Sequence, residues 1–228
     1  MRNQVNVRVN GNVGIFKRVV TRTLRVHALA GLLLVAAAAS AYSAPKTVLV
    51  LGDSLSAEYG LARGAGWVAL AQKKIKDQRI EADVVNASVS GETTSGGRSR
   101  LPALLDKYKP ALVVIELGAN DGLRGLPVAA AHANLRAMSE AADKAGAKVM
   151  LIGMRIPPNY GRDYADKFYA MYGTVSKEVN APLVPFMLDG VAEKTQLFQA
   201  DRLHPLAEAH PTILANIWPV LQKSIKAK

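Results

Sequence analysis

The sequence predicts an α/β protein, a three-layer α/β/α sandwich in which helices cover both faces of a central, parallel, five-stranded sheet. Short apolar runs, such as Leu112 to Leu117, alternate with longer segments whose apolar residues recur at helical spacing. Strands that alternate with helices form parallel βαβ units, and an unbroken apolar run is typical of a strand buried on both faces. With 228 residues, 50% of them hydrophobic, the chain can bury one sizeable core.

The pattern places five strands and five main helices in order along the chain. The predicted strands are residues 48–51, 83–87, 112–117, 148–152 and 181–184. The predicted helices are residues 67–75, 101–108, 130–145, 164–179 and 211–225. We expect Pro102 in the first turn of its helix or at a bend, and Pro211 at the start of the last helix. Because no repeat or low-complexity linker follows Ala44, residues 45–228 are predicted to form one domain.

The first 44 residues differ from the rest of the chain. They contain six Lys or Arg residues and no acidic residue, and residues 26–41 are almost all apolar or small. This order predicts a secretory signal peptide over residues 1–44, and therefore a bacterial protein of the periplasm or exterior. An uncleaved membrane anchor is the alternative, although the apolar part is shorter than the roughly 20 residues of a spanning helix. We expect no stable membrane span after processing.

Charge and composition narrow the classes of function. The net charge is +11, but removing the leader leaves 23 basic and 18 acidic residues, or +5, which weakens a nucleic-acid interpretation. The chain has no cysteine and no His-x-x-x-His pair. We therefore expect no disulfide, no cysteine nucleophile, and no metal or other cofactor.

The most informative stretch is residues 48–56, where four apolar residues lead into a Gly-Asp-Ser turn. Ligands of open parallel sheets bind beyond the carboxyl ends of the strands, so Ser54 is a candidate nucleophile. A serine hydroxyl needs an adjacent base, a group that orients this base, and donors for the developing oxyanion. The alternative is that Asp53 and Ser54 only form a turn or a helix cap.

Later polar clusters can supply the missing groups. His204 would accept the proton of Ser54, and Asp201, three residues earlier, would orient the imidazole. The oxyanion hole would combine the backbone N–H groups of Ser54 and Gly91 with the side-chain amide of Asn120. Parallel strands would bring these groups to one edge of the sheet.

Four short blocks occur in a defined order: Gly52–Ser56, Ser90–Thr93, Gly118–Asp121 and Asp201–Pro205. Through these blocks the chain resembles the SGNH (GDSL) hydrolase superfamily, whose name lists the serine, glycine, asparagine and histidine of the blocks. The resemblance covers essentially everything from Lys46 onward. Residues 116–125 and 156–161 look most like the periplasmic thioesterase I, lysophospholipase and arylesterase subfamily.

The resemblance implies a flavodoxin-like arrangement of the sheet and a serine esterase without a cofactor. Its substrates would be acyl esters and thioesters, including aryl esters, acyl-CoA and lysophospholipids, and the reaction would pass through an acyl-enzyme on Ser54. The substrate-binding residues would be Ala119, Ile156, Pro157, Pro158, Asn159 and Tyr160. Two positions depart from the family pattern, because Ala119 and Arg202 stand where glycine is usual, and Arg202 puts a cation beside the catalytic histidine.

Other classes of function remain alternatives. One is an acyltransferase that uses the same acyl-enzyme, and another is a non-catalytic lipid- or carbohydrate-binding protein on the same scaffold. A flavodoxin-like phosphate binder is weaker, because Asp53 puts a carboxylate where the anion would lie. We expect a monomer that acts on small-molecule or lipid acyl esters and binds no nucleic acid.

The remaining polar residues of interest are assigned structural roles. His132 is predicted on the exposed side of a helix, and His210 at the start of the last helix. Glu116 lies on a buried strand and is expected to make a structural hydrogen bond, because an unpaired buried charge is costly. Asp53 and Asp121 are expected to form hydrogen bonds in their turns rather than a catalytic pair.

Overall fold

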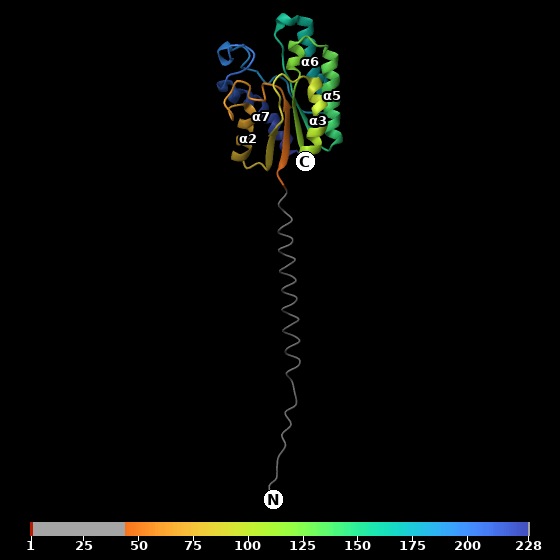
Figure 1. Ribbon diagram of the computed structural model, residues 1–228, viewed down its shortest axis with the longest axis vertical. Coiled ribbons are helices and arrows are strands. Elements are labelled where there is room, and N and C mark those ends of the chain that lie inside the picture. The colour runs from red at the N-terminus through yellow and green to blue at the C-terminus, as the bar shows by residue number, and fades with distance from the viewer. Residues whose placement is uncertain (2–43, 228) are drawn as a thin grey trace. The chain divides into compact units, whose positions relative to one another are not determined.

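Helices cover both faces of a central parallel sheet (Figure 1). The computed structural model describes Met1 and residues 44–227. The predicted signal peptide, and the membrane anchor that is its alternative, therefore fall outside the described residues. No helix in the described part of the chain is long and apolar enough to cross a lipid bilayer.

The sheet has the strand order β2-β1-β3-β4-β5, and every neighbouring pair is parallel. The strands are β1 Lys46–Gly52, β2 Ala82–Asn86, β3 Leu112–Glu116, β4 Lys148–Ile152 and β5 Leu183–Val184. The predicted five-stranded parallel sheet is thus confirmed, although β5 has only two residues. Because all strands run the same way, the loops that follow them all lie at the carboxyl edge of the sheet.

The helices divide between the two faces of the sheet. They are α2 Trp67–Asp77, α3 Thr94–Tyr108, α4 Ala119–Leu123, α5 Val128–Lys144, α6 Arg162–Glu178 and α7 His210–Lys226. Three short 3-10 turns are η1 Pro158–Tyr160, η2 Thr195–Leu197 and η3 Ala207–Ala209. Helices α2 and α7 pack together on one side of the sheet, and α5 packs against α3 and α6 on the other (Figure 1).

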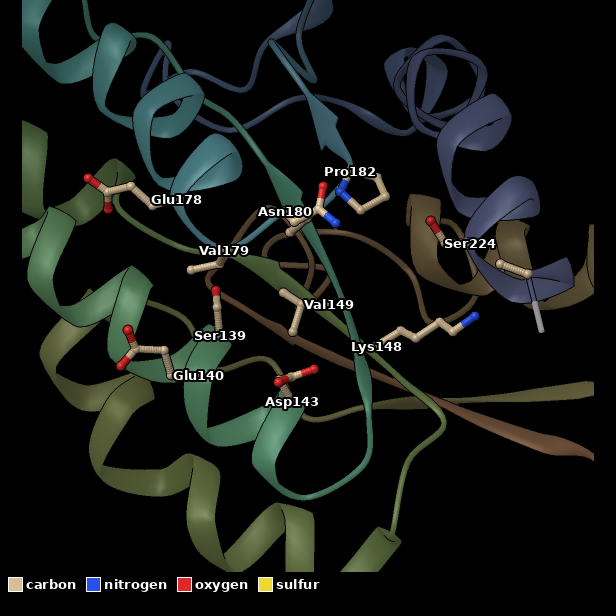
Figure 2. Close-up of a pocket in the computed structure, with 12 residues that line it drawn as sticks. Ser139, Glu140, Asp143, Lys148, Val149, Glu178, Val179, Asn180, Pro182 and Ser224 are labelled. Carbon is tan, nitrogen blue, oxygen red and sulfur yellow. The ribbon is translucent and has the colours of Figure 1, made fainter.

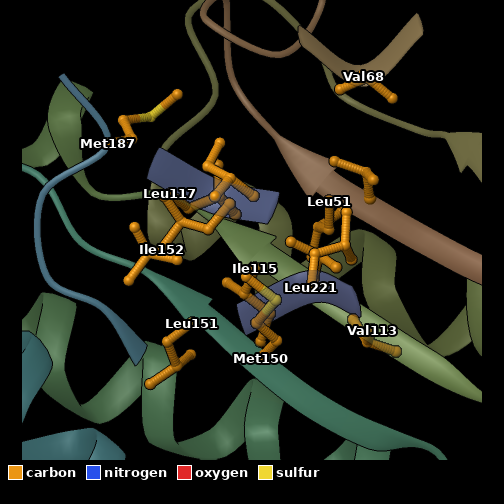
Figure 3. Close-up of a cluster of buried hydrophobic side chains, with 14 of the residues drawn as sticks. Leu51, Val68, Val113, Ile115, Leu117, Met150, Leu151, Ile152, Met187 and Leu221 are labelled. Carbon is orange, nitrogen blue, oxygen red and sulfur yellow. The ribbon is translucent and has the colours of Figure 1, made fainter. Parts of the chain in front are cut away.

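The apolar core lies between these layers. Figure 3 shows Leu51, Ile115 and Met150 from three central strands, with Leu221 of α7 and Val68 of α2 nearby, and all five side chains are buried. Burial of such side chains is the main driving force for folding. A rigid packed sheet holds the loops at its carboxyl edge in fixed relative positions.

Helix α3 begins earlier than predicted, at Thr94 instead of Leu101, and Pro102 lies in its interior instead of its first turn. The Thr93 hydroxyl caps the helix by accepting a hydrogen bond from the Gly96 N–H. A Cβ atom at Gly97 would lie only 2.2 Å from Leu117 Cδ1, so glycine allows the helix to approach the sheet closely. Gly97 therefore serves packing inside the helix.

Two further segments differ from the sequence prediction. The residues after β3, expected to form a turn, form the short helix α4. The last helix begins at His210, one residue before Pro211, which lies in its first turn as expected for proline there.

Candidate active site

The loops at the carboxyl edge bring the predicted catalytic groups together. Ser54 follows β1, Gly91 follows β2, and Asn120 lies in α4 directly after β3. Asp201 and His204 lie in the long connection between β5 and α7. Ser54 and His204 meet although they are 150 positions apart in the sequence.

A hydrogen-bonded relay joins Ser54, His204 and Asp201. His204 Nε2 lies 2.9 Å from Ser54 Oγ, and His204 Nδ1 lies 2.7 Å from Asp201 Oδ2. Both distances are within the range for proton transfer along a hydrogen bond. The geometry is therefore that of a nucleophile, a base and a group that orients the base.

The Asp201 carboxylate is held by its own turn. Its Oδ1 accepts the backbone N–H groups of Leu203 at 2.9 Å and His204 at 3.0 Å. Partial burial raises its pKa, but these bonds and the His204 side chain outweigh burial and lower the pKa of Asp201 to about 2. The ring of Tyr59 lies 4.4 Å from the His204 ring. An ionised carboxylate on one side and an aromatic ring on another thus fix the imidazole.

Two backbone donors are free at this site. Within the described residues, nothing accepts a hydrogen bond from the N–H groups of Ser54 and Gly91. Gly91 has a φ of 78°, in the left-handed region that favours glycine. Both N–H groups are available to an oxyanion.

The amide of Asn120 is engaged within the protein. Its Nδ2 donates to Asp53 Oδ2 at 3.1 Å and to the Glu92 carbonyl at 3.0 Å. An amide nitrogen has two hydrogens, so both are used. Donation to an oxyanion would require one of these bonds to be exchanged or shared.

Asp53 forms a buried pair of carboxyl groups with Glu116, which the sequence analysis did not anticipate. The backbone nitrogen of Asp53 lies 3.4 Å from Glu116 Oε2, and Gly52 of β1 lies in register with Glu116 of β3. Burial raises the pKa of Asp53 to about 6. Burial, and then the charge of Asp53, raise the pKa of Glu116 well above its ordinary value. Protonation of Glu116 is therefore favoured by the fold. The only sequence signal for this pair was an acid at the end of an apolar strand.

A cavity of about 440 Å³ opens beside Ser54 and His204. Its larger apolar lining residues are Leu123, Met154, Ile156, Phe186, Leu188 and Phe198. Of these six residues only Ile156 was predicted. Leu123 lies in the short helix α4, and the other four lie in irregular segments that have no hydrophobic period. A mainly apolar wall of this kind suits an acyl chain.

The predicted substrate-binding residues divide between the cavity and the surface. Ala119, Ile156 and Pro157 line the cavity. Asn159 and Tyr160 are exposed and lie outside its lining, and the side chain of Pro158 is outside the described part of the structure.

Two arginines lie at the cavity mouth. The Arg155 guanidinium packs 4.2 Å from the ring of Tyr169 and 5.2 Å from that of Phe186. Arg202 also lines the cavity, and its φ of 58° explains why glycine suits this position. The cation expected near His204 is therefore found in the lining of the same cavity.

The other polar residues have structural partners. His132 is half-buried rather than exposed, because its Nε2 lies 3.0 Å from Glu178 Oε2 and joins α5 to α6. His210 begins α7, and its Nδ1 accepts the backbone N–H of Trp67 at 3.0 Å. Asp121 does not bond within its own turn as predicted, because its carboxylate accepts both the N–H and the hydroxyl of Thr94.

A second cavity, of about 610 Å³, lies near β4, α5 and α6 (Figure 2). Charged residues such as Glu140, Asp143 and Lys148 line it. Its two serine hydroxyls, of Ser139 and Ser224, donate to backbone carbonyls four residues earlier in their own helices. This cavity therefore has no activated nucleophile. Among the described residues, no group of three or more side chains of the kind that bind metals lies together.

The parallel sheet and the relay at its carboxyl edge define the class of protein as a serine hydrolase. Comparison with known proteins agrees, because the model of the GDSL-like Lipase/Acylhydrolase family matches residues 50–211. The chain belongs to this family, as the four sequence blocks predicted, and it is an esterase of the serine hydrolase type.

Similar proteins include the esterase TesA of Pseudomonas aeruginosa, which is 51% identical over 79% of this chain and 90% of its own length. Thioesterase 1/protease 1/lysophospholipase L1 of Escherichia coli K12 is 43% identical over 75% of this chain and 81% of its own. The crystal structure of the psychrotrophic esterase EstA from Pseudoalteromonas, inhibited by monoethylphosphonate, superimposes with a TM-score of 0.76. That structure is 42% identical and covers 80% of this chain and 100% of its own.

Proposed function

We propose that this esterase has broad acyl specificity and hydrolyses aryl esters, acyl thioesters such as acyl-CoA, and lysophospholipids. The apolar wall of the cavity beside Ser54 supports an acyl chain as the group bound there. The name of the Escherichia coli relative supports thioesters and lysophospholipids as substrates.

In the proposed reaction, Ser54 Oγ attacks the carbonyl carbon of the ester while its proton passes to His204 Nε2. The tetrahedral intermediate then collapses, the bond to the leaving oxygen or sulfur breaks, and His204 gives its proton to the leaving group. Water attacks the resulting acyl-enzyme with His204 again as base. The carboxylic acid leaves, and Ser54 regains its proton. Asp201 stabilises the imidazolium at each stage.

The oxyanion would bind to the free N–H groups of Ser54 and Gly91. Asn120 would become the third donor by exchanging one of its two internal hydrogen bonds. Loss of one such donor typically reduces kcat by about 10²–10³.

The observation that supports this mechanism best is the relay of 2.9 and 2.7 Å from Ser54 through His204 to Asp201. The test is hydrolysis of an aryl acyl ester by the native protein and by the Ser54→Ala variant. A serine-directed phosphonate should add one label to the native protein, at Ser54, and none to the variant. Full turnover by Ser54→Ala would refute the mechanism.

The same assay separates the alternatives. Added alcohol would divert the product from acid to ester if the protein were mainly an acyltransferase. Tight lipid binding without turnover or phosphonate labelling would favour a non-catalytic binding protein.

We also propose that residues 1–44 are a signal peptide and that residues 45–228 act as a periplasmic, monomeric enzyme. The basic and apolar composition of the first segment supports export. All proposed catalytic groups come from one chain, so a second copy is not needed. Periplasmic extraction followed by N-terminal sequencing and light scattering tests the location, the cleavage site and the oligomeric state.

A further inference from the structure

Large apolar side chains that are exposed to solvent gather at one edge of the sheet. In the described chain after Ala44 they are Tyr59, Val89, Leu126, Tyr160 and Leu203, with exposed fractions between 38% and 50%. Each lies in a different loop, and these loops follow the five strands in turn. Because the strands are parallel, all five side chains belong to the carboxyl edge. Exposed apolar residues that are scattered singly over a surface are common. A group of them at a single edge of the sheet indicates a contact surface.

Four of these side chains are connected with the cavity beside Ser54 and His204, through its lining, a ring contact or proximity in sequence. Leu203 lines the cavity, and the ring of Tyr59 contacts that of His204. Leu126 and Tyr160 each follow a lining residue by three positions. A substrate held in a layer against this edge would therefore meet the cavity directly.

Positive charge is found at the same edge. Five exposed arginines lie in these loops or at the first residue of α6: Arg63, Arg124, Arg155, Arg162 and Arg202. Among the described residues, none of the five forms an ion pair with a carboxylate. Their charges are thus available to a partner.

Most acids of this edge are already engaged. Asp53 and Asp121 are buried, and Glu58 accepts the backbone N–H groups of Gly64 and Gly66. Three others have cationic or imidazole partners: Glu92, Asp163 and Asp201. Three exposed acids of the described loops have no ion pair: Asp189, Glu193 and Glu208. The five arginines therefore outnumber the acids that could neutralise them.

We propose that the carboxyl edge of the sheet docks on an anionic phospholipid surface. Tyr59, Val89, Leu126, Tyr160 and Leu203 would enter the interface, and the arginines would lie at the phosphate groups. Apolar side chains with flanking Arg residues are the combination that binds anionic bilayers. In this orientation the mouth of the cavity faces the lipid. The docking itself does not depend on the esterase reaction.

The test is co-sedimentation of the full chain with vesicles of phosphatidylcholine alone and with vesicles that also contain phosphatidylglycerol. The Arg63→Gln/Arg162→Gln double variant removes two rim charges and should weaken binding to the anionic vesicles about 25-fold at low salt, since each arginine contributes about fivefold. The Val89→Ser/Leu126→Ser double variant should weaken binding to the same vesicles severalfold. Neither pair lines the catalytic cavity.

The matched control is the Arg79→Gln/Lys144→Gln double variant, which removes two exposed charges, from the turn after α2 and from the end of α5, at the opposite edge and should bind like the native protein. All chains have the same N-terminal segment, so its contribution to binding is constant. Hydrolysis of a soluble short-chain ester should be unchanged in every variant, which shows that they are folded and separates docking from catalysis. The proposal is overturned if the native protein does not bind anionic vesicles, or if the rim and control variants bind these vesicles equally. A native dimer that the rim variants convert to monomers would also overturn it, because the edge would then contact protein.

Discussion

The Glu116 carboxyl group accepts a hydrogen bond of 2.6 Å from the Ser56 hydroxyl, two residues beyond the proposed nucleophile. Ser56 in turn accepts a bond from Trp67 Nε1 at 3.1 Å, and Glu116 lies 3.4 Å from the backbone nitrogen of Asp53. These bonds join the turn of Ser54 to β3 and to α2. Because the network is buried, each of its polar groups depends on its partner.

Replacing Glu116 tests this network. Glu116→Gln keeps the shape of the side chain and an oxygen that can accept the same hydrogen bonds, and we expect it to fold. Glu116→Leu leaves the Ser56 hydroxyl and the Asp53 N–H without this acceptor, and should cost about 1–3 kcal/mol of unfolding free energy for each group. Urea unfolding of both variants measures the difference. Glu140→Gln is the control, because Glu140 is exposed and pairs only with Arg136 within its own helix.

The pH dependence of stability gives a second readout of the same pair. The folded-state pKa values of Asp53 and Glu116 lie above their unfolded values of 3.8 and 4.5. The folded state therefore binds more protons in this window, and its unfolding free energy falls as the pH rises, for Asp53 between about 4 and about 6. Glu116→Gln should lose part of this fall. Equal slopes in the native protein and Glu116→Gln would show that folding does not raise the pKa of Glu116.

His210 should give a pH dependence of the opposite sign. Burial lowers its pKa below 6.5, and its Nδ1 accepts the backbone N–H of Trp67. As the pH falls below 6.5, the unfolded chain gains a proton that the folded state resists, so the unfolding free energy falls. His210→Asn can still accept the Trp67 N–H but does not titrate. Urea unfolding on both sides of pH 6.5 should therefore show that the unfolding free energy decreases less at acid pH in the variant than in the native protein. An equal decrease in both would contradict the lowered pKa of His210.

The sequence predicted which groups of the candidate site lie together better than it predicted their surroundings, for a physical reason. Ser54, Gly91 and Asn120 each follow a strand of the sheet, and parallel strands necessarily end at one edge. The partner of Asp53 depends instead on the register of β1 against β3, which no local pattern encodes. The wall of the cavity around Phe186 comes from an irregular connection where apolar residues have no period to recognise.

Gly91 should be required for catalysis because of its backbone conformation, and not because a larger side chain would lack room. Its φ is 78°, but a Cβ atom would meet nothing closer than Arg124 Nη2 at 3.8 Å. Gly91→Ala should therefore cost about 1–2 kcal/mol of stability through strain, and should also lower kcat about 10²-fold by turning the N–H away from the oxyanion. Gly64→Ala is a matched control, since Gly64 has a φ of 89° and open space around its Cβ position. It should lose similar stability and keep kcat; an equal loss of kcat in both would remove Gly91 from the oxyanion hole.

Asp201 should act by orienting the imidazole of His204. The Asp201→Asn variant should therefore have a lower kcat but bind the substrate as the native protein does. Asp201→Asn keeps the size of the side chain but removes the charge that holds Nδ1 of His204 as a donor, and kcat should fall about 10³–10⁴-fold with little change in KM. Because the pKa of Asp201 is lowered to about 2, its ionised form adds stability that is fully present above pH 3.8 and is lost as the pH falls through 2. The variant should therefore lack the part of the loss of unfolding free energy at low pH that comes from Asp201.

Asp106→Asn, an exposed position on α3, is the control for both measurements. A fall in kcat of less than tenfold in Asp201→Asn would mean that the Tyr59 ring and the backbone suffice to orient the imidazole, and that the relay ends at His204.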